Sequence, residues 1–133
     1  MFDDLNFRKI GFVLALLGGV YYYAQGHIRI DDLFKYAKAR PVHDERARDV
    51  YYVGMVYWLK SDNEHAIEVF STLLADETTT QYSPRALMRL GGCYRDMYKF
   101  NDAKAAYEKY MEEYPQGEDI TIVKNNYEFV KFR

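Results

Sequence analysis

The sequence predicts an all-α protein with two parts: an N-terminal transmembrane helix, and a short solenoid of helical hairpins closed by a C-terminal capping helix. Three observations predict this fold. Residues 10–28 contain no Asp, Glu, Lys or Arg. Apolar residues in the remainder recur every three or four positions, as they do on one face of a helix. Two stretches of the chain also share the same spaced residues, and 133 residues leave room for one compact domain beside an anchor.

The uncharged segment of residues 10–28 has the features of a membrane anchor. As a helix it spans roughly 28 Å at about 1.5 Å per residue, close to the thickness of the hydrocarbon core. Arg8 and Lys9 precede it, and three consecutive tyrosines suit a membrane interface. A cleaved signal peptide is the competing interpretation, but the bulky Tyr22 lies where a cleavage site has a small residue. We therefore expect residues 1–28 to be a retained anchor that contacts the lipid bilayer.

Small residues recur on one stripe of this expected anchor, and a stripe of this kind lets a second membrane helix approach closely. They are Gly11, Ala15, Gly18 and Gly19. The alternative is that glycine is simply common in membrane helices. The basic pair before the segment favours a bacterial inner-membrane protein with its domain on the periplasmic side. Basic residues that follow the segment favour the alternative, a cytoplasmic domain, and these are Arg29, Lys35, Lys38 and Arg40.

Helical periodicity continues through the rest of the chain. Residues 29–43 are expected to form a juxtamembrane amphipathic helix and a linker, with the helix ending before Pro41. Further helices are expected over residues 44–60, 63–75, 83–98, 101–114 and 118–132. Asn63 and Asn101 are the expected N-caps, and Pro84 suits a first helical turn. The polar residues 76–83 are expected to bulge out as a loop.

The two similar stretches carry one spaced pattern. The first has Val50, Val53, Gly54, Tyr57, Ala66 and Phe70; the second has Leu87, Leu90, Gly91, Tyr94, Ala103, Tyr107 and Pro115. This pattern resembles the tetratricopeptide repeat. The resemblance places repeats at about residues 44–80 and 83–116, inside a domain of residues 44–133 whose last helix is a cap. We expect these signature residues to be structural, with each glycine lying against the small alanine of the following helix.

The resemblance also implies a binding groove, lined by the first helix of each repeat. Carried over residue by residue, the groove residues are Arg48, Tyr51, Met55, Trp58, Arg85, Met88, Gly92 and Arg95. Aromatic residues, methionine and arginine are enriched at protein interfaces, so these are candidate partner-binding residues. The alternative is that Tyr51 and Trp58 pack on the helix over residues 30–40.

Composition and motifs indicate a protein that binds other proteins. The chain has 14 Tyr and 8 Phe, and its formal charge of -2 offers no positive field for nucleic acid. It lacks the sequence motifs of the common catalytic and metal sites, and its single Cys93 and three histidines have no metal-ligand spacing. We therefore expect no catalysis, no cofactor, no metal and no small-molecule substrate. The predicted function is a scaffold or assembly subunit that binds other subunits of a membrane complex; the alternative is a membrane-anchored chaperone-like module of secretion or envelope biogenesis.

Overall fold

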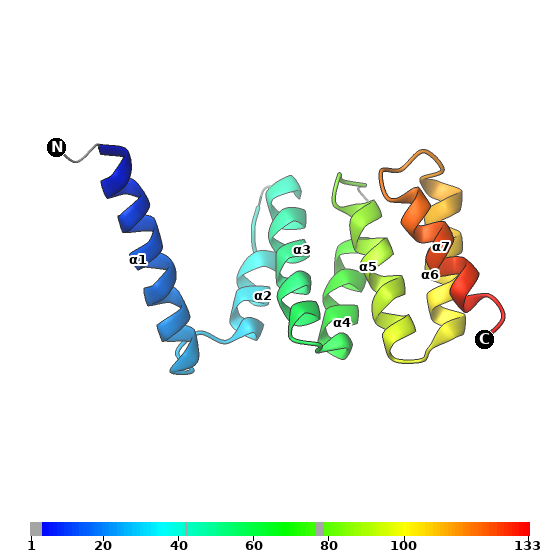
Figure 1. Ribbon diagram of the computed structural model, residues 1–133, viewed down its shortest axis with the longest axis horizontal. Helices are drawn as coiled ribbons and strands as arrows, with labels where there is room; N and C mark the ends of the chain where they lie inside the picture. Colours follow the sequence, from blue (N-terminus) through cyan, green and yellow to red (C-terminus); the bar gives the residue numbers. More distant parts are fainter. Residues whose placement is uncertain (1–3, 42, 77–78) are drawn as a thin grey trace. The chain divides into compact units, whose positions relative to one another are not determined.

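The computed structural model describes residues 4–41, 43–76 and 79–133. Within these residues the regular elements are all helices, so the predicted all-α class is confirmed. The chain divides into two compact units, Met1–Leu33 and Phe34–Arg133. The helices of the described residues, shown in Figure 1, are α1 (Asp4–Ala24), α2 (Ile30–Lys38), α3 (His43–Leu59), α4 (Asn63–Leu74), α5 (Ser83–Asp96), α6 (Phe100–Glu113) and α7 (Ile120–Val130).

The first unit contains α1, which does not meet the requirements of a membrane span. Among the described residues, no helix combines the length and the apolar character that crossing a membrane needs. α1 ends at Ala24, and the chain then turns at Gly26, whose φ is 75°. The uncharged part of α1, residues 10–24, is therefore about 22 Å long at about 1.5 Å per residue, against a hydrocarbon core of about 30 Å. The predicted single-pass anchor is wrong, and so is the single-pass inner-membrane localisation that depended on it.

The small residues of α1 lie on its exposed surface. Gly11, Ala15, Gly18 and Gly19 are all exposed. A Cβ atom added to any of these three glycines would have no described atom within 4 Å. These residues were predicted to pack against another membrane helix. That prediction required a transmembrane anchor, so it has no support in this structure.

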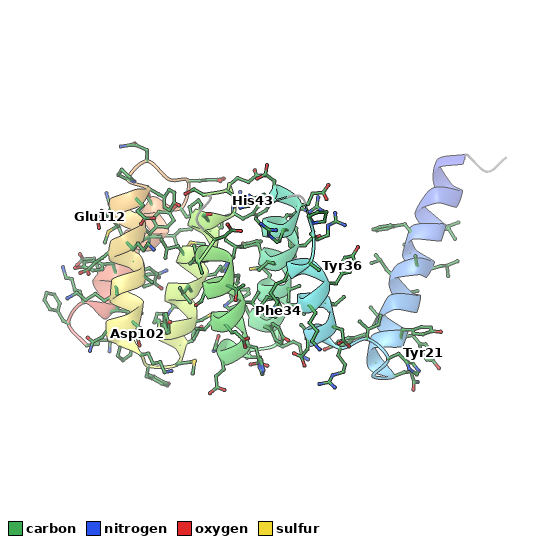
Figure 2. The ribbon with its side chains drawn as sticks, turned by 180° about the vertical axis from the view of Figure 1, so that it is seen from behind. Tyr21, Phe34, Tyr36, His43, Asp102 and Glu112 are labelled. Carbon is green, nitrogen blue, oxygen red and sulfur yellow. The ribbon has the colours of Figure 1, made fainter. Side chains whose placement is uncertain are left out.

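The second unit begins within α2. Phe34 and Ala37 are buried, and Figure 2 shows Phe34 on the side of α2 that points toward the other helices of the second unit. Tyr36 is on the opposite side and is exposed. The helix ends at Lys38, three residues before Pro41, so the expected short amphipathic helix is present.

The helices of the second unit follow one another as hairpins. α3 packs against α4 and α5 against α6, while α4 also contacts α5 and α6 contacts α7, as Figure 1 shows. Each hairpin has the same connection of three residues between its helices. In both connections the middle residue has a left-handed backbone, with φ of 59° at Ser61 and 60° at Tyr98. The two hairpins therefore repeat in backbone conformation as well as in sequence.

Each repeat glycine lies against an aromatic ring of its hairpin partner. A Cβ atom added at Gly54 would be 2.5 Å from Cε1 of Phe70, and one added at Gly91 would be 2.5 Å from Cε1 of Tyr107. The atoms nearest to each glycine belong to the ring of the residue one helical turn after the small alanine, a contact that the sequence had not predicted. Among the described residues, the largest fully buried side chains are Tyr107, Tyr110, Phe70, Val69, Val123, Val130 and Cys93.

The remaining signature residues lie in or beside this core. Ala66, Ala103 and Tyr57 are buried, and Tyr57 stacks on the ring of His65 with centroids 5.1 Å apart. Tyr94 is half-buried, and Pro115 is exposed directly after α6.

Two helix starts differ from the prediction. The N-cap of α4 is Asp62, whose carboxylate accepts a hydrogen bond from the backbone N–H of His65; Asn63 is the first helical residue. α6 begins at Phe100 without a side-chain cap, so Asn101 is not an N-cap. Pro84 lies in the first turn of α5 as expected.

The connection between α4 and α5 is partly folded onto the domain. Thr80 and Ser83 are buried, and the hydroxyl of Ser83 accepts a hydrogen bond of 2.9 Å from the backbone N–H of Thr80. This part of the expected bulge is therefore packed. Residues 77–78 of the predicted loop lie outside the described residues.

Candidate functional site

α3, α5 and α7 present side chains to one shared face of the second unit. Contacts between side chains connect the three helices in order. The ring of Tyr82, next to the start of α5, lies 5.6 Å from that of Tyr51 of α3. Arg95 of α5 donates a hydrogen bond of 3.2 Å to the side-chain oxygen of Asn126 of α7. We call this surface the α3–α5–α7 face; its residues are Arg48, Tyr52, Met55, Trp58, Leu59, Arg85, Met88, Arg89, Gly92, Arg95, Ile122, Asn126 and Phe129.

Of the residues predicted on α3, three reach this face and one lies beneath it. Met55, Trp58 and Arg48 are half-buried, and the side chain of Arg48 is 43% exposed. Tyr51 is only 7% exposed, because its ring packs among Phe70 and two other tyrosines. The structure therefore places Tyr51 in the support of the face, whereas Met55 and Trp58 are available to a ligand.

The residues predicted on α5 all lie on the face. Arg85 is exposed, and Met88, Gly92 and Arg95 are half-buried. A Cβ atom added at Gly92 would have no described atom within 4 Å, which leaves open space above the middle of α5. Met88 also packs against the core cluster built from α5, α6 and α7.

Sequence reasoning missed an apolar stripe on α3. Tyr52, Met55 and Leu59 are separated by three and four residues, so they lie on one stripe of the helix. Leu59 is 71% exposed and Tyr52 is 56% exposed. The signal was the number of apolar residues on α3, which has more of them than a single buried stripe needs.

A second exposed apolar pair lies on α7. Ile122 and Phe129 come four residues before and three residues after Asn126, so they share its stripe. Both are about half exposed, and the guanidinium of Arg133 lies 4.0 Å from the centroid of the Phe129 ring. The face thus has apolar side chains along α3 and α7, on either side of the arginines of α5.

Sequence reasoning also missed Arg89, which is one helical turn after Arg85. Its guanidinium carbon is 4.4 Å from the centroid of the Trp58 ring, a distance at which a cation and an aromatic ring attract each other. Arg89 therefore connects α5 to α3 across the face. The spacing of four residues from Arg85 was the signal that could have found it.

The other arginines of the face are paired with acidic groups of the chain. Arg85 donates a hydrogen bond of 3.2 Å to Glu118, and this bond raises the pKa of the guanidinium. Arg48 donates one of 3.0 Å to Asp49, with the same effect on its pKa. Arg95 forms an ion pair with Asp96 as well as its contact with α7.

A cavity of about 220 Å³ opens at the end of this face where α5 begins. Its lining includes Tyr52, Tyr82, Arg85, Glu118 and Asp119. The Arg85–Glu118 pair thus forms part of its wall. A cavity of this size accommodates a side chain of a bound protein rather than a large cofactor.

Groups that could act as nucleophiles or metal ligands lie elsewhere. Cys93 is fully buried, and burial raises the pKa of its thiol to about 11, which keeps it protonated and unreactive near neutral pH. The histidines contact separate carboxylates: His65 lies 2.8 Å from Asp62 and His43 lies 3.2 Å from Asp76. In the described part of the chain, His, Cys, Asp and Glu side chains form no group of three that could hold a metal ion.

Comparison of the chain with models of known protein families found no match, and comparison with curated proteins found none either. The geometry of the α3–α5–α7 face is therefore what bears on function.

Proposed function

We propose that the chain is a tetratricopeptide-type binding module that holds a segment of another protein on its α3–α5–α7 face and catalyses no reaction. The observation that carries the proposal is the exposed apolar surface of this face. Leu59 and Tyr52 on α3, with Ile122 and Phe129 on α7, leave large apolar side chains in water on both sides of α5. Exposed apolar side chains that gather in one patch are typical of protein-binding surfaces.

The repeat architecture supports the family part of the proposal. Both hairpins have the same backbone turn, at Ser61 and Tyr98, and the same glycine-to-ring contact. A hairpin that buries its apolar residues only by stacking on its neighbours is the unit of such solenoids. In this architecture the first helices of successive hairpins share one surface, and here they are α3 and α5.

The composition of the face supports a protein ligand. Trp, Tyr, Met and Arg are enriched at protein interfaces, and this face carries all four. Gly92 leaves room for a bound segment to approach the backbone of α5.

Site-specific photocrosslinking in cells tests the proposal. A photoreactive amino acid at position 59, on α3, is expected to give discrete crosslinks to a partner protein. The matched control is the same amino acid at Lys109, an exposed residue of α6 that is not part of the face. Crosslinks from position 109 but not from position 59 would place the binding surface elsewhere.

A substitution provides the second arm of this test. Leu59→Asp changes an exposed residue, so we expect it to alter the free energy of unfolding by no more than about 0.5 kcal/mol. A charge in the apolar stripe should still remove the partner, measured by crosslinking from position 55. A variant that melts normally and keeps its crosslinks would contradict the proposal.

A further inference from the structure

The arginines of the α3–α5–α7 face differ in how their charges are compensated. Arg48, Arg85 and Arg95 each contact a carboxylate of the chain, at 3.0, 3.2 and 3.0 Å. Arg89 has no carboxylate partner among the described residues. Its Nε atom is buried and has no hydrogen-bond partner among them. This N–H group has therefore lost water without gaining a hydrogen-bond partner from the described residues, and the charge has no counter-ion among them.

Packing keeps Arg89 in place without neutralising it. The Trp58 ring, 4.4 Å from the guanidinium carbon, supports one face of the planar group. A cation held in one orientation loses less conformational entropy when it binds an acid, and the fork of a guanidinium fits a carboxylate with two parallel hydrogen bonds. Arg89 is thus pre-organised for an anionic group that approaches from the side away from the Trp58 ring.

The surroundings of Arg89 restrict the source of that anion. Gly92, one turn later on α5, leaves open space beside it. Exposed or half-buried apolar side chains lie on the other two helices of the face, Met55 and Leu59 on α3 and Ile122 and Phe129 on α7. A small free anion would leave these apolar groups exposed, whereas a protein segment with apolar residues around one acidic residue would cover them.

We infer that the segment bound by this face carries an Asp or Glu side chain that pairs with Arg89, with apolar residues on either side of it. The inference rests on the proposed function and specifies the chemistry of the partner. The ion pair gives the complex its orientation, because it fixes which residue of the segment lies over Trp58. The apolar neighbours exclude water from the pair and strengthen it.

Selection from a library of random dodecapeptides tests this inference on the full chain. Peptides selected on the wild-type protein are expected to share an acidic residue flanked by apolar residues. The best sequence is then synthesised with an amidated C-terminus, so that its acidic side chain is the carboxylate measured. Trp58 is the only tryptophan of the chain, so its fluorescence reports binding directly.

Replacing the acidic residue of the peptide with its amide, Glu→Gln or Asp→Asn, should weaken binding about tenfold or more, the range of a hydrogen-bonded charge pair. Arg89→Gln should weaken binding of the acidic peptide similarly and remove most of the preference for acid over amide. Arg46→Gln, which removes a charge paired with Asp76 at a position of α3 outside the face, should change the affinity less than twofold. Circular dichroism verifies that each variant is folded. Arg89→Lys is a second variant at this position; it keeps the positive charge but lacks the planar guanidinium that packs on the Trp58 ring.

Three results would overturn the inference. One is a selected set without acidic enrichment; another is equal affinity for the acid and amide peptides; the third is acid preference that survives in Arg89→Gln. Gly92→Leu separates this failure from failure of the proposed function, because its side chain fills the open space over α5. If Gly92→Leu blocks peptides that show no acid preference, the binding face is correct and the acidic partner is wrong. If it leaves peptide binding unchanged, both are wrong.

Discussion

Two adjacent glycines of α5 provide a sharp test of the packing described above. Gly91 faces the ring of Tyr107, and Gly92 faces open space. Replacing either glycine with alanine gains helix propensity of about 0.5–1 kcal/mol. This gain is common to both variants, so it cancels in their difference. What remains is the steric cost of one methyl group at Gly91.

The structure sets the size of that steric cost. A Cβ atom at Gly91 would be 2.5 Å from Cε1 of Tyr107 and 2.9 Å from its Cδ1 and Cζ atoms. Carbon atoms prefer separations of about 3.5–4.0 Å, so the ring has to move by about 1 Å. Tyr107 is fully buried among α5, α6 and α7, where such a shift displaces other core residues. Overpacking of this kind costs about 1–3 kcal/mol.

Urea denaturation followed by far-UV circular dichroism measures the difference. Gly92→Ala is expected to be as stable as the wild type or more stable by up to about 1 kcal/mol. Gly91→Ala should be less stable than Gly92→Ala by about 1–3 kcal/mol, with an unchanged dependence on urea. Gly54→Ala repeats the test in the first hairpin, where the added atom meets Phe70 at the same 2.5 Å. Equal stabilities for Gly91→Ala and Gly92→Ala would refute the glycine-to-ring packing.

Three further predictions follow from single side chains of the second unit. Tyr107→Phe should raise the free energy of unfolding by about 1 kcal/mol, because the buried Tyr107 hydroxyl has no hydrogen-bond partner among the described residues. Tyr110→Phe is the control. It should lower the free energy of unfolding, because the Tyr110 hydroxyl accepts a hydrogen bond from the backbone N–H of Asp119. Asp62→Ala should lower the melting temperature through a lost N-cap worth about 0.5–2 kcal/mol. The hydrogen bond between the imidazole of His65 and the Asp62 carboxylate lowers the pKa of Asp62, and the backbone N-cap bond lowers it further. This contribution to stability is present above the usual carboxyl pKa and is lost as the pH falls through the lowered value. The pH-dependent melts of wild type and Asp62→Ala should therefore converge in acid. Iodoacetamide should label Cys93 only as fast as the domain unfolds, and rapid labelling of the folded protein would contradict its burial and its pKa of about 11.

The sequence by itself determined the all-α class and the position of each hairpin helix to within about two residues. Local signals suffice for this, because the spacing of apolar residues and the position of Pro84 in a first helical turn can be read directly from the sequence. They also identified most of the candidate face, since a helix displays residues three and four apart together. Asp62 shows the limit of local signals: it and Asn63 are both good caps, and only the folded turn selects between them.

The tertiary structure decided the features that depend on distance between helices. It showed that α1 ends at Ala24, which sequence counting had extended to residue 28 as an apparent membrane span. It placed Tyr51 beneath the face, because the Phe70 and Tyr82 rings of other elements cover it. It also brought Arg89 of α5 to the Trp58 ring of α3, a pairing across 31 residues that no local pattern contains. Burial and charge compensation are properties of neighbours in space, so they become known only when the helices pack.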